Sequence, residues 1–182
     1  MSKKILILNG SPRKNGNTKA LIESFTEGAK EAGHIVTIFN IHEMDIKHCT
    51  GCMAVCVDFK RKHCVQKDDM EKIYPVFEEA DIIVFASPLY FWNFTAQLKM
   101  VIDRLQSPCL AGIGPKAAML LSVAGDNVES VFAPVISYYQ SLLSNLRWED
   151  LGMVLAKEML KIGDIEGSQS LKDARKLGAS VH

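Results

Sequence analysis

The sequence predicts a doubly wound α/β fold, in which helices cover both faces of a parallel five-stranded sheet. Short, continuous apolar runs such as residues 3–8 are typical of strands that are buried on both sides. These runs alternate with stretches whose apolar residues recur at helical spacing, and such alternation builds right-handed βαβ units. A fold of this kind binds its ligand beyond the carboxyl ends of the strands, at the switch point of the sheet.

Strands and helices are expected to alternate along the whole chain. The expected strands are short apolar runs bounded by turn residues, at 3–8, 34–40, 81–86, 116–123 and 147–155. The expected helices have apolar residues at helical spacing, at 17–32, from 68 onward, at 95–105, in a long stretch that runs to about 145, and at 170–181. Four residues of the helix at 95–105 are expected to face the core: Leu98, Val101, Ile102 and Leu105.

Capping and breaking residues set the expected helix ends. A polar cap or a capping box marks three helix starts: Asn17, Asp68 with Glu71, and Ser170 with Asp173. Gly33 is expected to end the first helix. Pro75 is expected to kink or interrupt the second helix, and Pro134 to make the fourth start late or bend.

Length and composition indicate one globular domain, residues 1–182, without a linker or internal repeat. Hydrophobic residues make up 48% of the chain and the formal net charge is zero, so charge gives no argument for binding nucleic acid or a membrane surface. No apolar run reaches the roughly 18 residues of a membrane span, and the N-terminus lacks the features of a signal peptide. We therefore expect a cytoplasmic protein.

The loop after the first strand reads LNGSPRKNGNT, residues 8–18, and is rich in groups that hold anions. The start of a helix presents free N–H groups and a partial positive charge. Gly10 and Gly16 allow the backbone to curl close to an anion. Side-chain donors and positive charge come from Ser11, Arg13, Asn15, Asn17 and Thr18.

Two common phosphate loops do not fit this stretch. The Walker pattern needs a lysine between its glycine and its hydroxyl residue, and Asn17 stands there instead. The dinucleotide fingerprint needs GxGxxG, but Gly10 is followed only by Gly16. The loop therefore favours a terminal monophosphate, and the alternative is a polar turn without a ligand.

The loop after the third strand, in SPLYFWNFTAQLK at residues 87–99, contains three consecutive aromatic residues. Tyr90, Phe91 and Trp92 offer flat surfaces for a planar ring, and the backbone N–H groups around them can bind the edge of that ring. Alternatively, these side chains cap the core or build a subunit interface. A third loop, Ala124-Gly125-Asp126, is placed to line the far edge of the ring.

A monophosphate and a planar ring on this fold indicate flavin mononucleotide, FMN. Four motifs carry a resemblance to a known family: GSPRKNGNT at 10–18, CTGC at 49–52, KDDM at 67–70 and SPLYFWNFTAQLKMVIDR at 87–104. With these motifs in this order, the chain resembles the flavodoxin-like NAD(P)H-dependent FMN reductases, including their iron–sulfur flavoprotein relatives.

The resemblance implies a fold, a cofactor and a set of site residues. The fold is a three-layer, flavodoxin-like sandwich with strand order 2-1-3-4-5. The FMN phosphate is expected at Ser11, Arg13, Asn15, Gly16, Asn17 and Thr18. The flavin ring is expected against Pro88, Leu89, Tyr90, Phe91, Trp92 and Asn93, with Ala124, Gly125 and Asp126 at its far edge. Members of the family pair as homodimers or homotetramers with the flavin near the interface.

The activity expected from this resemblance is an FMN-dependent oxidoreductase. In such a site the flavin carries the chemistry and the protein supplies placement and electrostatics. NAD(P)H would pass a hydride to the flavin, and a small acceptor such as a quinone or free flavin would then take the electrons. No catalytic acid–base pair is required, and none with the quality of a motif is visible in the sequence.

The segment CTGCMAVCVDFKRKHC places four cysteines in an insertion loop at 41–67: Cys49, Cys52, Cys56 and Cys64. Thiolates bind iron–sulfur clusters and zinc, so a [4Fe–4S] cluster is one interpretation, zinc a second, and free or reversibly oxidised thiols a third. The spacing departs from the compact C-x2-C-x2-C of iron–sulfur flavoproteins by one residue. Lys60, Arg61 and Lys62 within the loop are interpreted as a solvated face.

Two other functions stay open at this point. The protein could be an iron–sulfur electron carrier that exchanges single electrons with ferredoxin. It could also be a phosphate-binding regulatory module without turnover, an alternative that the aromatic loop disfavours.

Overall fold

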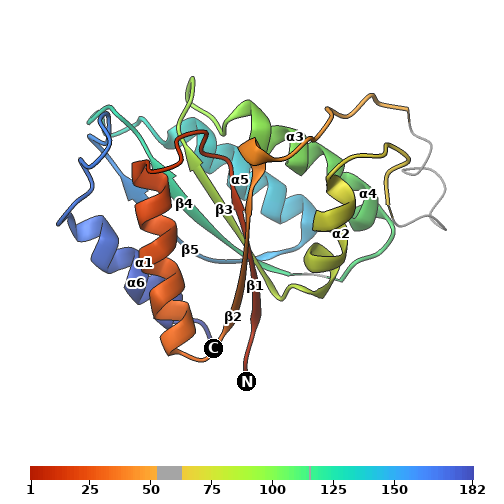
Figure 1. Cartoon of the computed structure of the whole chain (residues 1–182), viewed down its shortest axis with the longest axis horizontal. Coiled ribbons are helices and arrows are strands. Elements are labelled where there is room, and N and C mark those ends of the chain that lie inside the picture. Colours follow the sequence, from red (N-terminus) through yellow and green to blue (C-terminus); the bar gives the residue numbers. More distant parts are fainter. Residues whose placement is uncertain (53–62, 115) are drawn as a thin grey trace.

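The central feature of the computed structural model is a five-stranded parallel sheet with the strand order β2-β1-β3-β4-β5 (Figure 1). The structure describes residues 1–52, 63–114 and 116–182, so Cys56 and the basic residues at 60–62 lie outside the described residues. The strands are β1 (Lys4–Asn9), β2 (Ile35–Asn40), β3 (Ile82–Pro88), β4 (Ala117–Val123) and β5 (Glu149–Ala156). Every neighbouring pair is parallel, which confirms the predicted order and direction of the strands.

Helices cover both faces of the sheet and complete a three-layer arrangement (Figure 1). The helical elements are α1 (Asn17–Glu31), η1 (Ile41–Glu43), α2 (Met70–Glu79), α3 (Ala96–Arg104), α4 (Gln106–Leu110), α5 (Ala133–Leu146) and α6 (Gln169–Ala179). The pair α1 and α6 packs on one face, and the helices from α2 to α5 pack on the other. Within the described part of the chain, no helix is long and apolar enough to cross a membrane.

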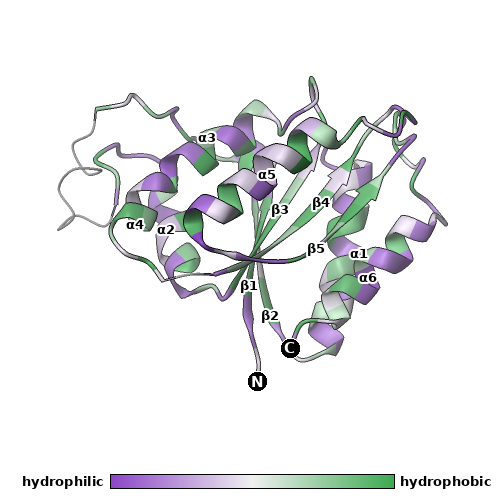
Figure 2. Cartoon of the chain, turned by 180° about the vertical axis from the view of Figure 1, so that it is seen from behind, coloured by the Kyte–Doolittle hydropathy of each residue, from purple (hydrophilic) through white to green (hydrophobic). Residues whose placement is uncertain are grey.

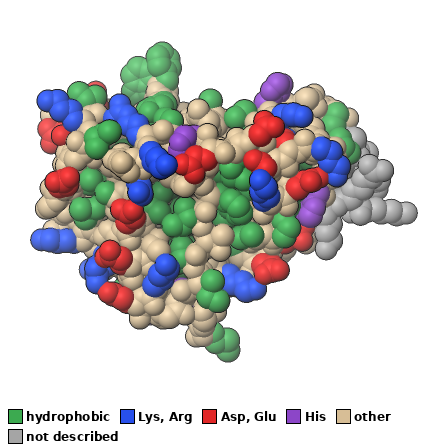
Figure 3. All heavy atoms as spheres, viewed as in Figure 1, with side chains coloured by type: hydrophobic (Ala, Val, Ile, Leu, Met, Phe, Trp, Pro, Cys, Tyr) green, Lys and Arg blue, Asp and Glu red, His purple; other side chains and the backbone are tan. Residues whose placement is uncertain are grey.

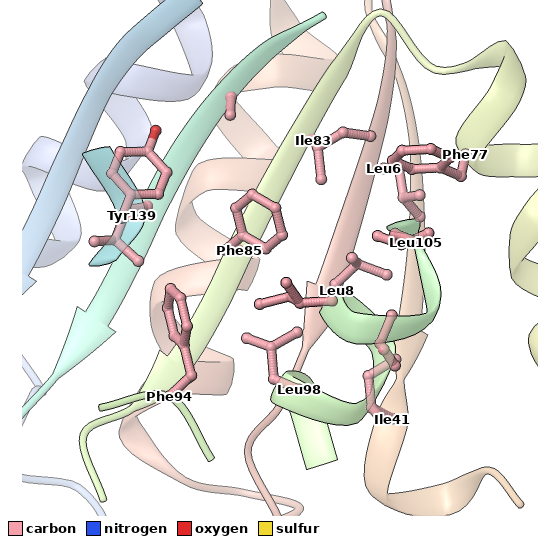
Figure 4. Close-up of a cluster of buried hydrophobic side chains, with 14 of the residues drawn as sticks. Leu6, Leu8, Ile41, Phe77, Ile83, Phe85, Phe94, Leu98, Leu105 and Tyr139 are labelled. Carbon is pink, nitrogen blue, oxygen red and sulfur yellow. The ribbon is translucent and has the colours of Figure 1, made fainter. Parts of the chain in front are cut away.

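Each face of the sheet has its own hydrophobic core because successive side chains of a strand point to opposite faces. In β1, Ile5 and Ile7 pack with α1 and α6, whereas Leu6 and Leu8 pack with α2, α3 and α5. Figure 4 shows part of the second core, and Figure 2 shows hydrophobic strands beneath helices with hydrophilic outer surfaces. The core residues predicted for α3 are buried, as expected: Leu98, Val101, Ile102 and Leu105.

A glycine of each helix lets α1 and α6 approach closely. A Cβ atom added to Gly28 of α1 would lie 2.0 Å from the carbonyl oxygen of Arg175. A Cβ atom added to Gly178 of α6 would lie 2.1 Å from the carbonyl oxygen of Phe25. These separations are far below a van der Waals contact, so this helix pair depends on both glycines.

The start of α1 differs from the prediction, whereas its end agrees. The N-cap of α1 is Gly16, not Asn17, and no side chain caps the helix. Asn17 is the first helical residue, and its side chain bonds elsewhere. Gly33 follows the helix with a φ of 87°, a conformation that glycine adopts without strain.

The capping box predicted at Asp68 and Glu71 is wrong. The N-cap of α2 is Asp69, and the Asp68 carboxylate is shared between an ion pair with Arg104 and a hydrogen bond from the Met70 N–H at 3.1 Å. The Glu71 carboxylate accepts a hydrogen bond from the Lys67 ammonium at 2.7 Å instead of turning back to the backbone. The helix also continues through Pro75, so the predicted interruption is absent from this helix.

Two further boundaries are corrected by the structure. The N-cap of α6 is Ser168, and Asp173 accepts a hydrogen bond from the side chain of Gln169, so the box predicted from Ser170 to Asp173 is wrong. Strand β3 extends to Pro88, which pairs with Val123 of β4, and the predicted loop therefore starts later. The short helix α4 was not predicted.

Candidate functional site

A pocket lies at the carboxyl edge of the sheet, where four loops meet. We name these loops after the strands they follow: the β1 loop (10–16), the β3 loop (89–95), the β4 loop (124–132) and the β5 loop (157–168). The pocket has a volume of about 110 Å³ and opens to a wide hollow beside the β4 loop. Its lining is Ser11, Arg13, Gly16, Asn17, Thr18, Pro88, Leu89, Tyr90, Val123, Gly125, Met159 and Leu160.

Most of the predicted site residues are brought together here. Those that line the pocket come from the β1 loop, the start of α1, the end of β3 and Gly125. Asp126 lines the adjoining hollow, which shares Gly125 and Leu160 with the pocket. The remaining predicted residues lie outside the lining of the pocket: Asn15, Phe91, Trp92, Asn93 and Ala124.

The sequence reasoning missed three lining residues, Val123, Met159 and Leu160. Met159 and Leu160 follow β5, whose carboxyl end reaches the same edge of the sheet as those of β1 and β3. The rule that places ligands beyond the carboxyl ends of parallel strands could have found them, because it applies to the fifth strand as well.

The β1 loop is shaped by short-range hydrogen bonds. The side-chain oxygen of Asn9, the last residue of β1, accepts a hydrogen bond from the Ser11 N–H at 3.0 Å. The Ser11 hydroxyl oxygen accepts one from the Arg13 N–H at 3.3 Å, and the Gly16 N–H donates to the Arg13 carbonyl at 3.1 Å. The chain is thus turned twice before α1 begins, which brings Ser11 beside the helix start.

The chemistry of this lining fits a phosphate monoester. The hydroxyl residues Ser11 and Thr18 line the pocket although both are almost fully buried. Arg13 brings a guanidinium group, and α1 starts here without a side-chain cap. None of the described residues in the lining is acidic. Hydroxyl donors, a cation and the positive end of a helix dipole together match a dianionic group.

The side chain of Asn17 contacts the β5 loop. Its Nδ2 atom donates to the carbonyl oxygens of Met159 at 3.1 Å and Lys161 at 2.8 Å, and its Oδ1 atom accepts from the Gly163 N–H at 3.1 Å. The Nη1 atom of Arg13 donates to the carbonyl oxygen between them, that of Leu160, at 2.9 Å. The start of α1 and the β5 loop therefore form one hydrogen-bonded unit.

The aromatic stretch forms a tight turn that projects from the sheet edge. Tyr90 and Asn93 exchange two backbone hydrogen bonds, and the two residues between them, Phe91 and Trp92, have φ values of 50° and 64°. Tyr90 borders the pocket, whereas Phe91 is 94% exposed and packs edge-to-face on Trp92. In Figure 3, a hydrophobic group protrudes from the surface at this position. In Figure 1, the same position is the loop above the end of β3.

A network of buried hydroxyl groups fixes the base of this turn. The Ser87 hydroxyl oxygen accepts a hydrogen bond from the Thr95 N–H at 3.1 Å, and the Thr95 hydroxyl donates to the Gly10 carbonyl at 2.8 Å. The Ser122 hydroxyl of β4 donates to the Ser87 carbonyl at 2.9 Å. A Cβ atom on Gly10 would lie 2.6 Å from the Leu98 Cβ atom, so glycine is needed where the β1 loop meets α3.

Three of the four candidate metal-binding cysteines line a second, small pocket of about 50 Å³: Cys49, Cys52 and Cys64. This pocket lies beside α4 and is well separated from the start of α1 (Figure 1). Among the described residues, no group of three or more His, Cys, Asp or Glu side chains is arranged to hold a metal ion. The fourth cysteine, Cys56, is not among the described residues.

Arg104, which lines this second pocket, forms a buried ion pair with Asp68. The Arg104 guanidinium donates to both carboxylate oxygens of Asp68, and also to the Lys47 carbonyl at 2.8 Å. Burial acts to raise the pKa of Asp68, but hydrogen bonds from Arg104 and from two backbone N–H groups outweigh it and hold this pKa below its usual value. The motif KDDM therefore serves mainly to anchor the cysteine-containing segment.

The fold and the pocket define a flavodoxin-like α/β protein with a candidate anion site at its first strand-to-helix loop. Residues 3–134 match the family model described as NADPH-dependent FMN reductase. The chain belongs to this family of flavin-dependent oxidoreductases.

Known proteins resemble the chain over most of its length. It is 30% identical to an iron–sulfur flavoprotein of Archaeoglobus fulgidus over 94% of this chain and 76% of that protein. It is 28% identical to the Bacillus subtilis protein YwqN, described as a putative NAD(P)H-dependent FMN-containing oxidoreductase, over 97% of this chain and 94% of that one. With some other archaeal iron–sulfur flavoproteins the similarity is confined to 101 residues, about half of their length.

The fold is shared with solved structures of flavodoxin-like oxidoreductases. The NAD(P)H:quinone oxidoreductase of Methanothermobacter marburgensis superposes with a TM-score of 0.82. That comparison covers 100% of this chain and 98% of the other at 22% identity. Identity at this level supports the fold, and the strand order agrees with the flavodoxin-like sandwich expected from the sequence.

Proposed function

We propose that this protein passes electrons from NAD(P)H to a small acceptor, such as a quinone or free flavin, with FMN held in the pocket at the carboxyl edge of the sheet. The observation that carries the proposal is the lining of that pocket. Buried hydroxyl groups of Ser11 and Thr18, the guanidinium of Arg13 and the uncapped start of α1 converge there without an acidic residue in the described lining.

The residues of the pocket divide into two groups by their chemistry. Ser11, Arg13 and Thr18 would bind the phosphate, together with the backbone N–H groups at the start of α1 and the side chain of Asn15 at the rim. The ring would lie against Pro88, Leu89 and Tyr90, with the β4 loop at its far edge. Bound FMN supplies hydride and electron transfer between NAD(P)H and the acceptor. Gly125 has no side chain, and the hollow beside it leaves one side of the site open to both substrates.

The phosphate site is tested by Thr18→Val, which removes a hydroxyl group at nearly constant volume. A hydrogen bond to a charged group contributes about 1.5–3 kcal/mol, so the Kd for FMN should rise about tenfold to a hundredfold. The Kd for riboflavin, which lacks the phosphate, should stay the same. Both constants are measured by quenching of flavin fluorescence.

Thr26→Val is the matched control, because Thr26 is a buried threonine of the same helix whose hydroxyl group has no hydrogen-bond partner among the described residues. It should leave both dissociation constants unchanged. An unchanged Kd for FMN in Thr18→Val, or a wild-type protein that binds no FMN, would overturn the proposed site.

We further propose a cytoplasmic homodimer or homotetramer in which the tip of the β3 loop lies at the subunit interface. The support is the exposure of Phe91 and the resemblance to a family whose members pair near the flavin. Light scattering of the purified protein gives the mass directly. A monomer at micromolar concentration contradicts this arrangement without affecting the flavin site.

A second candidate function is that of an iron–sulfur electron carrier with a [4Fe–4S] cluster. It is favoured by the similarity to an iron–sulfur flavoprotein and by the three cysteines that line one pocket. The described residues alone do not fit a cluster, because no three potential ligands converge. Iron and acid-labile sulfide should be measured in anaerobically purified protein, before and after Cys49→Ser. About four irons per chain, lost in the variant, would support the carrier, whereas flavin absorption without iron would exclude it.

A further inference from the structure

We propose that Asn17 is a positioning residue that holds the β5 loop as a wall of the pocket, and that its side chain does not bind the phosphate. This inference rests on the proposed function, because it assigns a role within the same flavin site. It differs from the sequence-based expectation, in which the Asn17 side chain is one of the phosphate ligands.

The hydrogen-bonding capacity of the Asn17 side chain is already used. A side-chain amide has two N–H donors and one carbonyl acceptor. Both donors engage carbonyl oxygens of the β5 loop, at Met159 and Lys161, and the acceptor engages the Gly163 N–H. The Asn17 side chain could bind a phosphate group only by giving up these hydrogen bonds to the β5 loop, and the residue is only 5% exposed.

The β5 loop depends on these bonds because its own side chains bury little surface here. Leu160 and Ile162 are 65% and 63% exposed. The loop is tied to the β4 loop at its start, where the Met159 N–H donates to the Ala124 carbonyl at 2.8 Å. Beyond that point, the Arg13 side chain holds the Leu160 carbonyl, and Asn17 supplies hydrogen bonds to residues 161 and 163. Removing the bonds from Asn17 should loosen the segment from 161 to 163.

The same segment forms one side of the pocket. Met159 and Leu160 both line it, and a Cβ atom placed on Gly125 would lie 3.0 Å from the Leu160 Cδ1 atom. Leu160 therefore borders both the pocket and the hollow beside the β4 loop, on the side where the ring and ribityl chain would lie. The hydrogen bonds from Asn17 set the position of this wall.

The two possible roles of Asn17 have different thermodynamic signatures. A residue that binds the phosphate contacts a group that riboflavin lacks, so its loss weakens the binding of FMN alone. A residue that holds the pocket wall affects the binding of the ring and ribityl chain, which FMN and riboflavin share. Its loss therefore weakens the binding of both molecules by the same factor. The ratio of the two dissociation constants therefore separates the two roles.

The experiment compares Asn17→Ala with Thr18→Val, which removes a proposed phosphate donor and should weaken the binding of FMN alone. Asn17→Ala should raise the Kd for FMN and for riboflavin by a similar factor of about ten, as expected for the loss of one or two net hydrogen bonds. The absorption bands of bound FMN should also move towards those of free FMN. A loss confined to FMN would overturn the proposal.

A second measurement needs no flavin. Trypsin cuts after exposed lysines, and Lys161 lies in the segment held by Asn17. In flavin-free protein, cleavage after Lys161 should be about tenfold faster in Asn17→Ala and in Asn17→Asp, which keeps the acceptor for Gly163 but loses both donors. Asn15→Ala should cleave at the wild-type rate. Equal rates in wild type and in both Asn17 variants would overturn the positioning role.

The two proposals fail in different ways. A wild-type protein that binds neither FMN nor riboflavin contradicts the proposed function and leaves the trypsin result for the β5 loop standing. A protein that binds FMN normally but shows a selective loss of FMN in Asn17→Ala contradicts only the inference about Asn17.

Discussion

The carboxylate of Asp68 and the guanidinium of Arg104 form a two-pronged ion pair that is sealed from solvent. The Oδ2–Nη1 distance is 2.7 Å and the Oδ1–Nη2 distance is 3.1 Å. The pair joins the residue before the N-cap of α2 to the end of α3, and Arg104 also holds the Lys47 carbonyl. Residues that are 36 positions apart are thereby locked together beside the cysteine pocket.

Breaking this pair should be costly for the fold. Asp68→Asn leaves a buried guanidinium without its counter-charge, and such changes lower the free energy of unfolding by about 3–5 kcal/mol. Asp69→Asn is the matched control, because Asp69 pairs with Lys72 near the surface and should contribute less than about 1 kcal/mol. Urea unfolding at pH 7 measures both. A loss for Asp68→Asn as small as that of the control would contradict the structural role.

The ion pair between Asp68 and Arg104 also predicts that the free energy of unfolding depends on pH. The pKa of Asp68 is held below its usual value in the folded protein. Its stabilising contribution is therefore complete above the pKa of an unfolded aspartate, about 3.9, and is lost as the pH falls through the lower folded-state pKa. The difference in unfolding free energy between wild type and Asp68→Asn should be constant from pH 7 to about 5 and shrink below about pH 4. A difference that does not change with pH would show that the pKa of Asp68 is the same in the folded and unfolded states.

The contact between α1 and α6 should not tolerate a methyl group. Alanine favours an isolated helix by about 1 kcal/mol over glycine, yet a Cβ atom on Gly178 would lie 2.1 Å from a carbonyl oxygen of α1. Overpacking costs about 1–3 kcal/mol, so Gly178→Ala should lower Tm by about 5 °C or more. Thermal unfolding followed by circular dichroism is compared with that of Gly114→Ala, where an added Cβ meets nothing within 4 Å.

The β3 loop should become more stable when the two residues at its tip are replaced by residues that adopt positive φ without strain. Positive φ at Phe91 and Trp92 costs on the order of 1–3 kcal/mol for each bulky residue, whereas Asn-Gly suits a two-residue turn of this kind. Phe91→Asn with Trp92→Gly should therefore raise the free energy of unfolding by about 1–2 kcal/mol in urea. Under the proposed function, the variant should also lose the subunit interface. A less stable variant would show that contacts of the two aromatic side chains within the chain stabilise it by more than the backbone strain destabilises it.

Cys109 should react slowly with alkylating reagents. Burial raises the pKa of its thiol to about 11, and the thiolate is the reactive form. At pH 8 it should therefore hold about a hundredfold less thiolate than an ordinary cysteine with a pKa of about 8.5. Mass spectrometry after iodoacetamide treatment compares it with the exposed Cys49. The labelling rate of Cys109 should keep rising between pH 8 and 10, and a rate that levels off below pH 9 would contradict its burial.

The arrangement of strands could be predicted because the central strands β1, β3 and β4 are continuous apolar runs that pair on both sides. Residues 3–8 and 116–123 were predicted within one or two residues of β1 and β4 for this reason. Helix starts were harder to predict, because a capping residue can be taken up by a distant partner. Asp68 reads as part of a capping box in the sequence, but Arg104 binds its carboxylate in the fold.

The candidate site could also be predicted only in part from the sequence. Ser11, Arg13 and Thr18 could be named from the sequence because the loop that holds them is local and its donors lie within eight residues. Met159 and Leu160 were missed, because their loop follows the fifth strand, at the edge of the sheet, and only the rule for the carboxyl ends of parallel strands points to it. Phe91 and Trp92 were expected against the ring, but the tight turn between Tyr90 and Asn93 directs them outward in the isolated chain.

The sequence by itself determined the fold class, the strand order implied by its family resemblance, and the place of the candidate anion pocket, because these follow from local apolar runs and from one loop. The tertiary structure decided which polar side chains are still available for a ligand. Asn17 illustrates the reason. A phosphate oxygen would need an N–H donor, and both donors of the Asn17 amide bond backbone carbonyl groups more than 140 residues away.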